Sequence, residues 1–166
     1  MKLFLSSIFA LSIIISNVVS AREIQVFGVG NHESREVRCL ARNIYHEAGA
    51  ESYEGKLAVA QVTANRVEDG RFPTSFCAVV SQKGLIDNRY VCQFSWYCTY
   101  KRDQEPPNNE NYRESLELAK RVIKDGLRSM ALKDALYFHS TSIDPKWGKP
   151  VVTVIGNHIF YKDYKK

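Results

Sequence analysis

The sequence has few histidines, and none of the histidine spacings that bind a catalytic metal. The four are His32, His46, His139 and His158, and no His-Glu-x-x-His pattern or other recognisable ligand set connects them. Glycine-rich phosphate loops and nucleic-acid-binding motifs are also absent. We therefore expect no metal ion, no cofactor and no nucleic-acid partner.

Cysteine is scarce as well, and its even number argues against a thiol enzyme. Cys39, Cys77, Cys92 and Cys98 favour two disulfide bonds in a protein that enters an oxidising compartment. A cysteine peptidase that uses His139 would instead need a free thiol. Of the three possible pairings, short-loop closure favours Cys92–Cys98, which leaves Cys39 for Cys77.

Long apolar runs are missing except at the N-terminus. Lys2 precedes an apolar stretch over residues 3–16, and small residues lead to Ala21, which together indicate a secretory signal peptide over residues 1–21. The run is shorter than the ~20 apolar residues of a membrane span, although an uncleaved anchor remains an alternative. We predict one secreted or periplasmic domain, residues 22–166, that is monomeric and has no membrane span after cleavage.

Apolar residues recur at helical spacing in several segments. Residues 35–48 form the first amphipathic helix. Residues 53–67 follow Ser52, a good N-cap, and are so rich in alanine and valine that this helix should be buried on more than one side. A short helix near residues 74–79 and a further long helix over residues 110–125 complete the set.

The C-terminal part changes from a helical to an alternating period. Residues 135–141 are typical of a strand, and residues 151–155 and 158–162 flank a glycine-asparagine pair that favours a two-residue hairpin turn. Residues 81–109 have no sustained period, and we predict a long functional loop rich in aromatic residues there. Helices followed by a small antiparallel sheet define an α+β domain.

Glu47 is the main candidate for chemistry. It lies at the border of the apolar stripe of the first helix, seven residues after Leu40 and three after Ile44. Partial burial raises the pKa of a carboxyl group, and glycosidases obtain a general acid in this way. A solvated or helix-capping glutamate is the alternative that the pattern alone leaves open.

Several segments match the motifs of a known family in that family's order. They are residues 39–67, 71–80, 92–96, 135–139 and 154–161, and together they resemble the SleB-type cell-wall hydrolases, known from spore-cortex lytic enzymes. The resemblance implies a lysozyme-like domain that acts on the glycan strands of peptidoglycan, often as a lytic transglycosylase. The mild net charge of +5 suits the peptide carboxylates of that polymer.

The resemblance implies that Glu47 is the catalytic residue, with one departure from the family's motif. Where the family commonly has Glu-Ala-Arg-Gly-Glu, this chain has Glu47-Ala-Gly-Ala-Glu51. Both glutamates are present, but the arginine is absent. The ion-pair partner of either glutamate therefore stays open.

The reaction type depends on whether a second carboxylate takes part. Glycosidases with two carboxylates place them on opposite sides of the sugar, ~5 Å apart for retention and ~6.5–9.5 Å for inversion. Glu51, four residues from Glu47, does not straddle a ring, so we favour a lytic transglycosylase, which needs one acid/base group. The alternatives are a hydrolytic muramidase that uses Asp87, Asp103 or Asp144, and a non-catalytic cell-wall-binding domain.

Candidate substrate-binding residues come from the aromatic loop and the C-terminal strands. The resemblance places residues 92–96 in the glycan groove, tryptophan rings can stack on sugar faces, and alternate residues of a strand share one face. With Glu51, the candidates are Gln93, Ser95, Trp96, Tyr137, His139 and Trp147.

Overall fold

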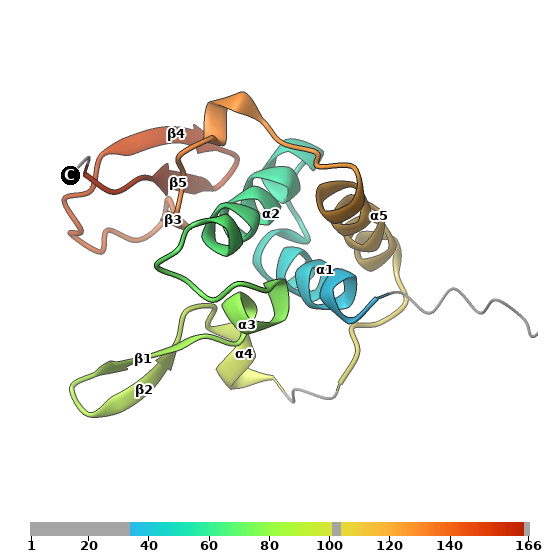
Figure 1. Cartoon of the computed structure of the whole chain (residues 1–166), viewed down its shortest axis with the longest axis horizontal. Helices are drawn as coiled ribbons and strands as arrows, with labels where there is room; N and C mark the ends of the chain where they lie inside the picture. Colours follow the sequence, from blue (N-terminus) through green and yellow to red (C-terminus); the bar gives the residue numbers. More distant parts are fainter. Residues whose placement is uncertain (1–33, 101–103, 165–166) are drawn as a thin grey trace, which may run out of the picture. The chain divides into compact units, whose positions relative to one another are not determined.

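The computed structural model describes residues 34–100 and 104–164, which belong to the unit of the chain that spans Glu33–Lys166 (Figure 1). The expected signal peptide, residues 1–21, lies outside the described residues. Helices and small antiparallel sheets make up the described part, which confirms the α+β class expected from the sequence.

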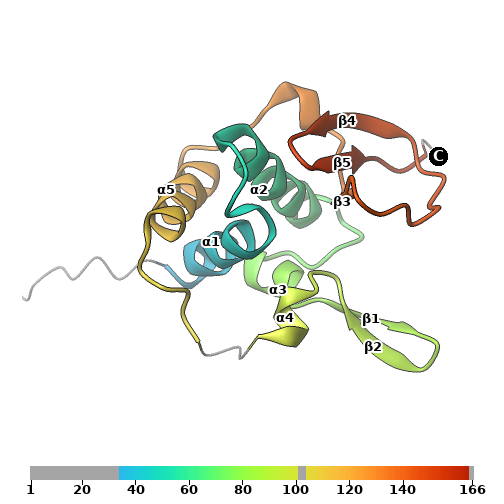
Figure 2. The ribbon, with the colours of Figure 1, turned by 180° about the vertical axis from the view of Figure 1, so that it is seen from behind.

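Three long helices pack side by side in both views of the ribbon (Figures 1 and 2). They are α1 (Arg35–Ala48), α2 (Tyr53–Glu68) and α5 (Glu110–Lys124), close to the predicted ranges. The apolar stripes of α1 and α5 meet in one core cluster. Each helix is preceded by a residue whose side chain accepts a hydrogen bond from a first-turn N–H, namely Ser34, Ser52 and Asn109.

Helix α2 is buried on two sides, as its composition predicts. Ala64 packs in the cluster that α1 and α5 share. Val62 packs in a second cluster with Phe160 of the C-terminal sheet and with Leu132 of the short 3-10 helix η1 (Met130–Leu132). An apolar helix between two layers has little surface left for solvent. Side chains of α2 therefore reach both the helices and the sheet.

The C-terminal strands form the predicted antiparallel sheet. Strands β3 (Tyr137–Ser140) and β4 (Val151–Ile155) both pair with the central strand β5 (His158–Tyr161). Gly156, in the turn between β4 and β5, has a φ of +56°, as the first position of a type II′ hairpin turn requires. Phe160 is fully buried and fixes the face of the sheet that meets α2.

The prediction of one long loop over residues 81–109 was wrong in part. Strands β1 (Lys83–Ile86) and β2 (Arg89–Cys92) form an antiparallel hairpin, and a one-turn helix, α4 (Trp96–Thr99), follows it. The Asp-Asn pair at the turn has positive φ at both residues, 48° and 59°, as a type I′ turn requires. The two strands are too short to show an alternating pattern, so the Asp-Asn pair was the only residue signal in the sequence that could have predicted this hairpin.

Two disulfide bonds tie the short elements to their neighbours. Cys39–Cys77 joins α1 to the helix α3 (Phe76–Val80), and Cys92–Cys98 joins the end of β2 to α4. These are the pairs expected from the sequence, and no cysteine is left free. Among the residues that the structure describes, no helix is long and apolar enough to cross a membrane.

Candidate active site

Glu47 lies one residue before the end of α1, where its side chain is half-buried. Burial raises the pKa of this carboxyl group from its ordinary value of 4.5 to about 7, because a charge is poorly solvated in apolar surroundings. The positive charge of Arg66 acts in the opposite direction. Within the described residues the Glu47 carboxyl group has no hydrogen-bond partner, so it remains available as an acid.

The cation whose charge acts on Glu47 is Arg66 on α2, which no sequence pattern had indicated. Arg66 is only 5% exposed, and its Nε donates a hydrogen bond to the Leu136 carbonyl oxygen at 2.7 Å. Its Nη1 is buried and has no hydrogen-bond partner in the described structure. The guanidinium carbon lies 5.2–5.6 Å from the ring centroids of Phe72, Phe94 and Tyr137. Cation–π contacts with these three rings stabilise the positive charge of the buried guanidinium.

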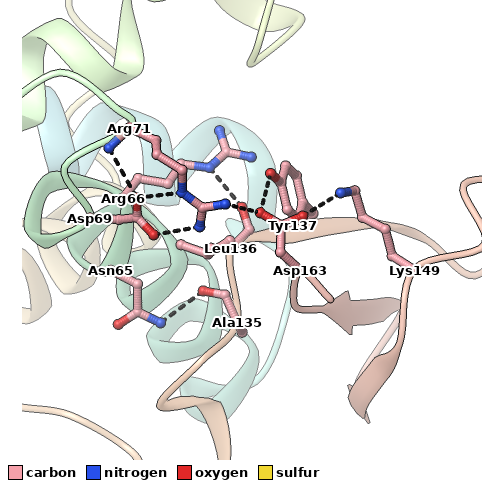
Figure 3. Close-up of polar contacts among 9 residues, drawn as sticks. All are labelled: Asn65, Arg66, Asp69, Arg71, Ala135, Leu136, Tyr137, Lys149 and Asp163. Carbon is pink, nitrogen blue, oxygen red and sulfur yellow. Dashed lines mark hydrogen bonds and ion pairs between the residues drawn. The ribbon is translucent and has the colours of Figure 1, made fainter. Parts of the chain in front are cut away.

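Two neighbouring side chains of α2 hold the backbone that leads into β3 (Figure 3). Asn65 Nδ2 donates to the Ala135 carbonyl oxygen at 2.8 Å, and Arg66 donates to the next carbonyl group, that of Leu136. Such bonds are costly to lose, since the buried acceptor is then left unpaired. The packing of α2 against β3 therefore determines where the Arg66 guanidinium lies.

Tyr137, the first residue of β3, is held by an acidic residue. Its hydroxyl donates to Asp163 Oδ2 at 3.0 Å, and Asp163 also accepts hydrogen bonds from Arg71 and Lys149 (Figure 3). The Lys149 Nζ atom lies 4.1 Å from the Tyr137 ring centroid. Burial and the bond to Asp163 raise the pKa of Tyr137. The phenol therefore stays neutral while its ring covers Arg66.

His46, next to the candidate acid, is stacked between two aromatic rings. Its ring centroid lies 4.4 Å from that of Trp96 and 4.9 Å from that of Tyr100. Trp96 is only 6% exposed, donates from Nε1 to Asn43 at 2.8 Å, and has the Arg42 guanidinium 5.5 Å from its ring centroid. This burial argues against the predicted stacking of Trp96 on a sugar, because protein groups already cover the ring.

Trp147 is the predicted stacking residue that the structure leaves at the surface. It is 44% exposed, and its ring centroid lies 5.3 Å from that of His139 and 6.3 Å from that of Tyr137. His139 is buried, and its ring nitrogens bond the Ser140 carbonyl oxygen and the Tyr161 hydroxyl. His139 thus holds this aromatic group together, and Trp147 is its exposed member.

The remaining sequence candidates lie in two separate places. Gln93 and Ser95 are exposed at the base of the β1–β2 hairpin. Glu51 instead binds the turn between β4 and β5, where it accepts hydrogen bonds from Nδ2 and from the backbone N–H of Asn157, at 2.9 and 3.3 Å. These bonds lower the pKa of Glu51. No hydrogen bond or ion pair in the described structure joins these three residues to Glu47.

A second carboxylate does not interact with Glu47 in the part of the chain that the structure describes. Asp87 is at the tip of the β1–β2 hairpin, Asp144 is exposed and pairs with Lys146, and Asp103 lies outside the described residues. The described side chains also include no group of three His, Cys, Asp or Glu residues that could hold a metal ion.

The fold and the site together define an α+β domain in which a buried arginine, Arg66, acts electrostatically on the half-buried Glu47. The model of the cell wall hydrolase family matches residues 50–161, and the chain belongs to this family. Glu47 lies three residues before the matched range.

Among curated proteins, the chain is similar to spore cortex-lytic enzymes. It is 29% identical to that of Bacillus subtilis (strain 168) over 139 residues, which are 79% of this chain and 39% of that enzyme. It is 27% identical to that of Bacillus cereus over 135 residues, which are 79% of this chain and 46% of that enzyme. The chain therefore spans less than half the length of these relatives.

Among solved structures, the chain is similar to two SleB catalytic domains. That of the germination-specific lytic transglycosylase SleB from Bacillus anthracis has a TM-score of 0.59 and 25% identity, covering 80% of this chain and 98% of that domain. That of Bacillus cereus SleB has a TM-score of 0.57 and 25% identity, covering 76% of this chain and 89% of that domain. These matches confirm the SleB-type resemblance that the sequence motifs predicted.

Proposed function

We propose that this protein cleaves the glycan strands of peptidoglycan at the bond between N-acetylmuramic acid and N-acetylglucosamine, with Glu47 as the acid/base. The observation that carries the proposal is the half-buried Glu47 carboxyl group, whose pKa of about 7 leaves much of it protonated near neutral pH. Membership of the cell wall hydrolase family and the likeness to SleB catalytic domains support this class of substrate.

As a lytic transglycosylase, the protein needs only this one carboxyl group. Glu47 donates its proton to the glycosidic oxygen as that oxygen separates from C1 of the muramoyl sugar. The C6 hydroxyl of the same sugar then bonds to C1, and the Glu47 carboxylate accepts the hydroxyl proton. Glu47 is thereby returned to its protonated form, no water is consumed, and the product carries a 1,6-anhydro ring.

We prefer this reaction to the two alternatives on physical grounds. Hydrolysis with two carboxylates needs a second group across the sugar ring, and no carboxylate of the described residues interacts with Glu47. A non-catalytic binding domain has no use for a desolvated carboxyl group, which costs stability when it ionises. The transglycosylase uses this group in both of its proton transfers.

Four of the sequence candidates support the glycan in different ways in this proposal. The exposed ring of Trp147 stacks on a sugar face, and the exposed Gln93 and Ser95 donate and accept hydrogen bonds at the hairpin base. We also assign Tyr137 to the glycan groove, because its ring covers Arg66, whose charge acts on Glu47. In contrast, we assign His139, Trp96 and Glu51 to holding the site in shape, since each is bonded within the protein.

We further propose that residues 1–21 are removed as a signal peptide and that residues 22–166 form the catalytic domain, a monomer in the periplasm or outside the cell. The two disulfide bonds support an oxidising compartment.

Digestion of purified peptidoglycan in ¹⁸O-labelled water tests the proposed reaction. Mass spectrometry of the soluble fragments should find muramoyl ends that are lighter than hydrolysed ends by one water molecule and that carry no label. Glu47→Gln keeps the shape of the side chain but not its acidity, so the rate should fall at least about 100-fold. The matched control is Glu54→Gln, which changes an exposed glutamate in the first turn of α2 and should leave the rate unchanged.

Three other outcomes of this experiment would contradict the proposal. Reducing ends that carry ¹⁸O would replace the transglycosylase by a muramidase. A Glu47→Gln variant that is nearly as active as the wild type would remove Glu47 from the mechanism. Binding of wild-type protein to peptidoglycan without release of any fragment would favour the cell-wall-binding domain.

A further inference from the structure

The strands of the β1–β2 hairpin form an exposed apolar element that the mechanism above does not use. Both views of the ribbon show the hairpin extending away from the helices (Figures 1 and 2). Its large apolar side chains are between 42% and 76% exposed, and they are Leu85, Ile86, Tyr90 and Val91. Exposed apolar side chains that cluster on one short element indicate a binding surface, because water solvates them poorly.

The strand register divides these side chains between two faces. Residues directly opposite each other in an antiparallel pair lie on one face, and successive residues of a strand alternate between the faces. The Gln93 backbone N–H donates to the Gln82 carbonyl oxygen at 3.0 Å, which extends the ladder by one pair beyond Cys92. One face, here called the Gln93 face, consists of Gly84, Ile86, Arg89, Val91 and Gln93. The opposite face consists of Lys83, Leu85, Tyr90 and Cys92.

The Gln93 face is the open one at the base of the hairpin. Gln93 is exposed, and its amide lies over Gly84, where an added Cβ atom would be 3.6 Å from Gln93 Nε2. Cys92, on the opposite face, is buried and is bonded to Cys98 of α4. Helix α4 therefore meets the hairpin from the opposite face, and the Gln93 face continues from the predicted glycan-binding position of Gln93 toward the tip.

Three kinds of group follow one another along the Gln93 face. The amide of Gln93 is at the base, the aliphatic side chains of Val91 and Ile86 come next, and Arg89 lies beside the turn. The row from Gln93 to Arg89 spans about 14 Å at the usual rise of a strand. No hydrogen bond or ion pair in the described structure engages the exposed Arg89 side chain. Its guanidinium is therefore available to an anion.

We propose that the Gln93 face binds the peptide that substitutes the muramoyl sugar of peptidoglycan, with Arg89 on a carboxylate of that peptide. The inference rests on the proposed function, which assigns Gln93 and Ser95 to the glycan. A peptide attached to a sugar at the hairpin base extends along the aliphatic side chains toward Arg89. Four extended residues span at most about 14 Å, which matches the length of the row, and a guanidinium binds a carboxylate strongly.

A glycan strand without peptides suits this face less well. The aromatic residue of the hairpin, Tyr90, is on the opposite face, and aromatic rings are the groups that stack on sugars. The carboxylate of an unsubstituted muramoyl sugar is attached next to the ring, at the Gln93 end of the row. Only the peptide carries a carboxylate as far as Arg89.

NMR titration of ¹⁵N-labelled protein with two soluble probes tests the proposal. The first probe is the disaccharide N-acetylglucosaminyl-N-acetylmuramic acid with a tetrapeptide on its lactyl group. The second has a methylamide in place of the tetrapeptide and carries no charge. The wild type should bind the first probe at least about fivefold more tightly, with shifts of the Gln93-face amides.

Two matched pairs of variants compare the faces. Arg89→Gln and Lys83→Gln each remove an exposed cation, and Ile86→Ser and Leu85→Ser each remove an exposed aliphatic side chain. On the Gln93 face, each variant should reduce the preference for the tetrapeptide probe to about twofold or less. On the opposite face, each variant should keep the wild-type preference, and the NMR spectrum of every variant shows whether it is folded.

Equal affinity of the wild type for the two probes, or no detectable binding of the tetrapeptide probe, would overturn the proposal. An equal loss of preference in both members of a matched pair would also overturn it, because the effect would not belong to one face. Neither probe contains the bond from muramic acid to N-acetylglucosamine, so the titration needs no activity. A wild-type protein that binds the tetrapeptide probe but cleaves no peptidoglycan would refute the proposed function and leave this inference standing.

Discussion

At the scale of single residues, Glu47 is held between two opposing electrostatic effects. Burial raises its pKa to about 7, and the charge of Arg66 acts against that rise. The unfolded chain has neither effect, since its carboxyl groups are hydrated. The raised pKa of Glu47 therefore makes the stability of the folded protein depend on pH.

Glu47→Gln should make the folded protein more stable at alkaline pH and leave it unchanged at acid pH. The folded pKa of Glu47 lies above its ordinary value of 4.5, so the unfolded chain ionises first and wild-type stability falls between about pH 4.5 and about pH 7. The full effect is at most about 3 kcal/mol, and it is smaller for a group that is partly open to solvent. Urea unfolding at both extremes of pH measures the difference. An equal difference at both would contradict the desolvation account.

The residue candidates show which roles a local pattern can predict. Glu47 was singled out by its helical spacing from Leu40 and Ile44 together with the family resemblance, and its role as the acid is still a prediction. Arg66 was missed because its partners belong to other elements. The only hint in the sequence was the missing arginine of the family motif, because its absence left Glu47 without an assigned ion-pair partner. Burial of Trp96 was also not predictable, because its cover comes from α1.

At the scale of elements, the junction between α1 and α2 is attached to the C-terminal sheet. Glu51 lies in this junction and binds Asn157 in the β4–β5 turn. A Cβ atom at Gly156 would lie 2.0 Å from Glu51 Oε2, so the Glu51 carboxylate would have to shift away from the turn. Glu51 is therefore better explained as the attachment of the hairpin than as a second acid.

Gly156→Ala should destabilise the protein by about 1–3 kcal/mol, because it adds both backbone strain at a φ of +56° and a clash with Glu51. Glu51→Ala removes the clash but not the strain. The double variant should therefore lose less stability than the sum of the two single variants, as measured by thermal unfolding. Strict additivity would show that the turn and Glu51 do not interact.

The elements differ in how well the sequence predicted them. The helices α1, α2 and α5 and the C-terminal hairpin agree with their predicted ranges within a few residues, because long periods and a glycine-asparagine turn are local signals. The β1–β2 hairpin was missed. Its strands are four residues each, and most of their side chains are exposed, so burial imposes no alternation on them.

At the scale of the whole molecule, the prediction concerns the proposed signal peptide and the two disulfide bonds. Its N-terminus should be Arg22, as found by N-terminal sequencing, and non-reducing peptide mapping should find Cys39–Cys77 and Cys92–Cys98. The first bond closes a sequence separation of 38 residues, so replacing both of its cysteines with serine should cost about 2–5 kcal/mol. A linked Cys77–Cys92 peptide, or a retained residue 1–21 segment, would contradict this account.

The sequence by itself determined the helices, the C-terminal sheet, the α+β class, the disulfide pairs and the identity of the candidate acid. The elements follow from periods, caps and turn residues, which act between residues close along the chain, and the cysteine pairs follow from short-loop closure of Cys92–Cys98, which leaves Cys39 for Cys77. Only the tertiary structure decided which cation acts on the pKa of Glu47, which tryptophan is exposed and what Glu51 binds. Those outcomes depend on how α2 packs against α1 and β3, and desolvation and charge are properties of such packing between distant segments, not of local sequence.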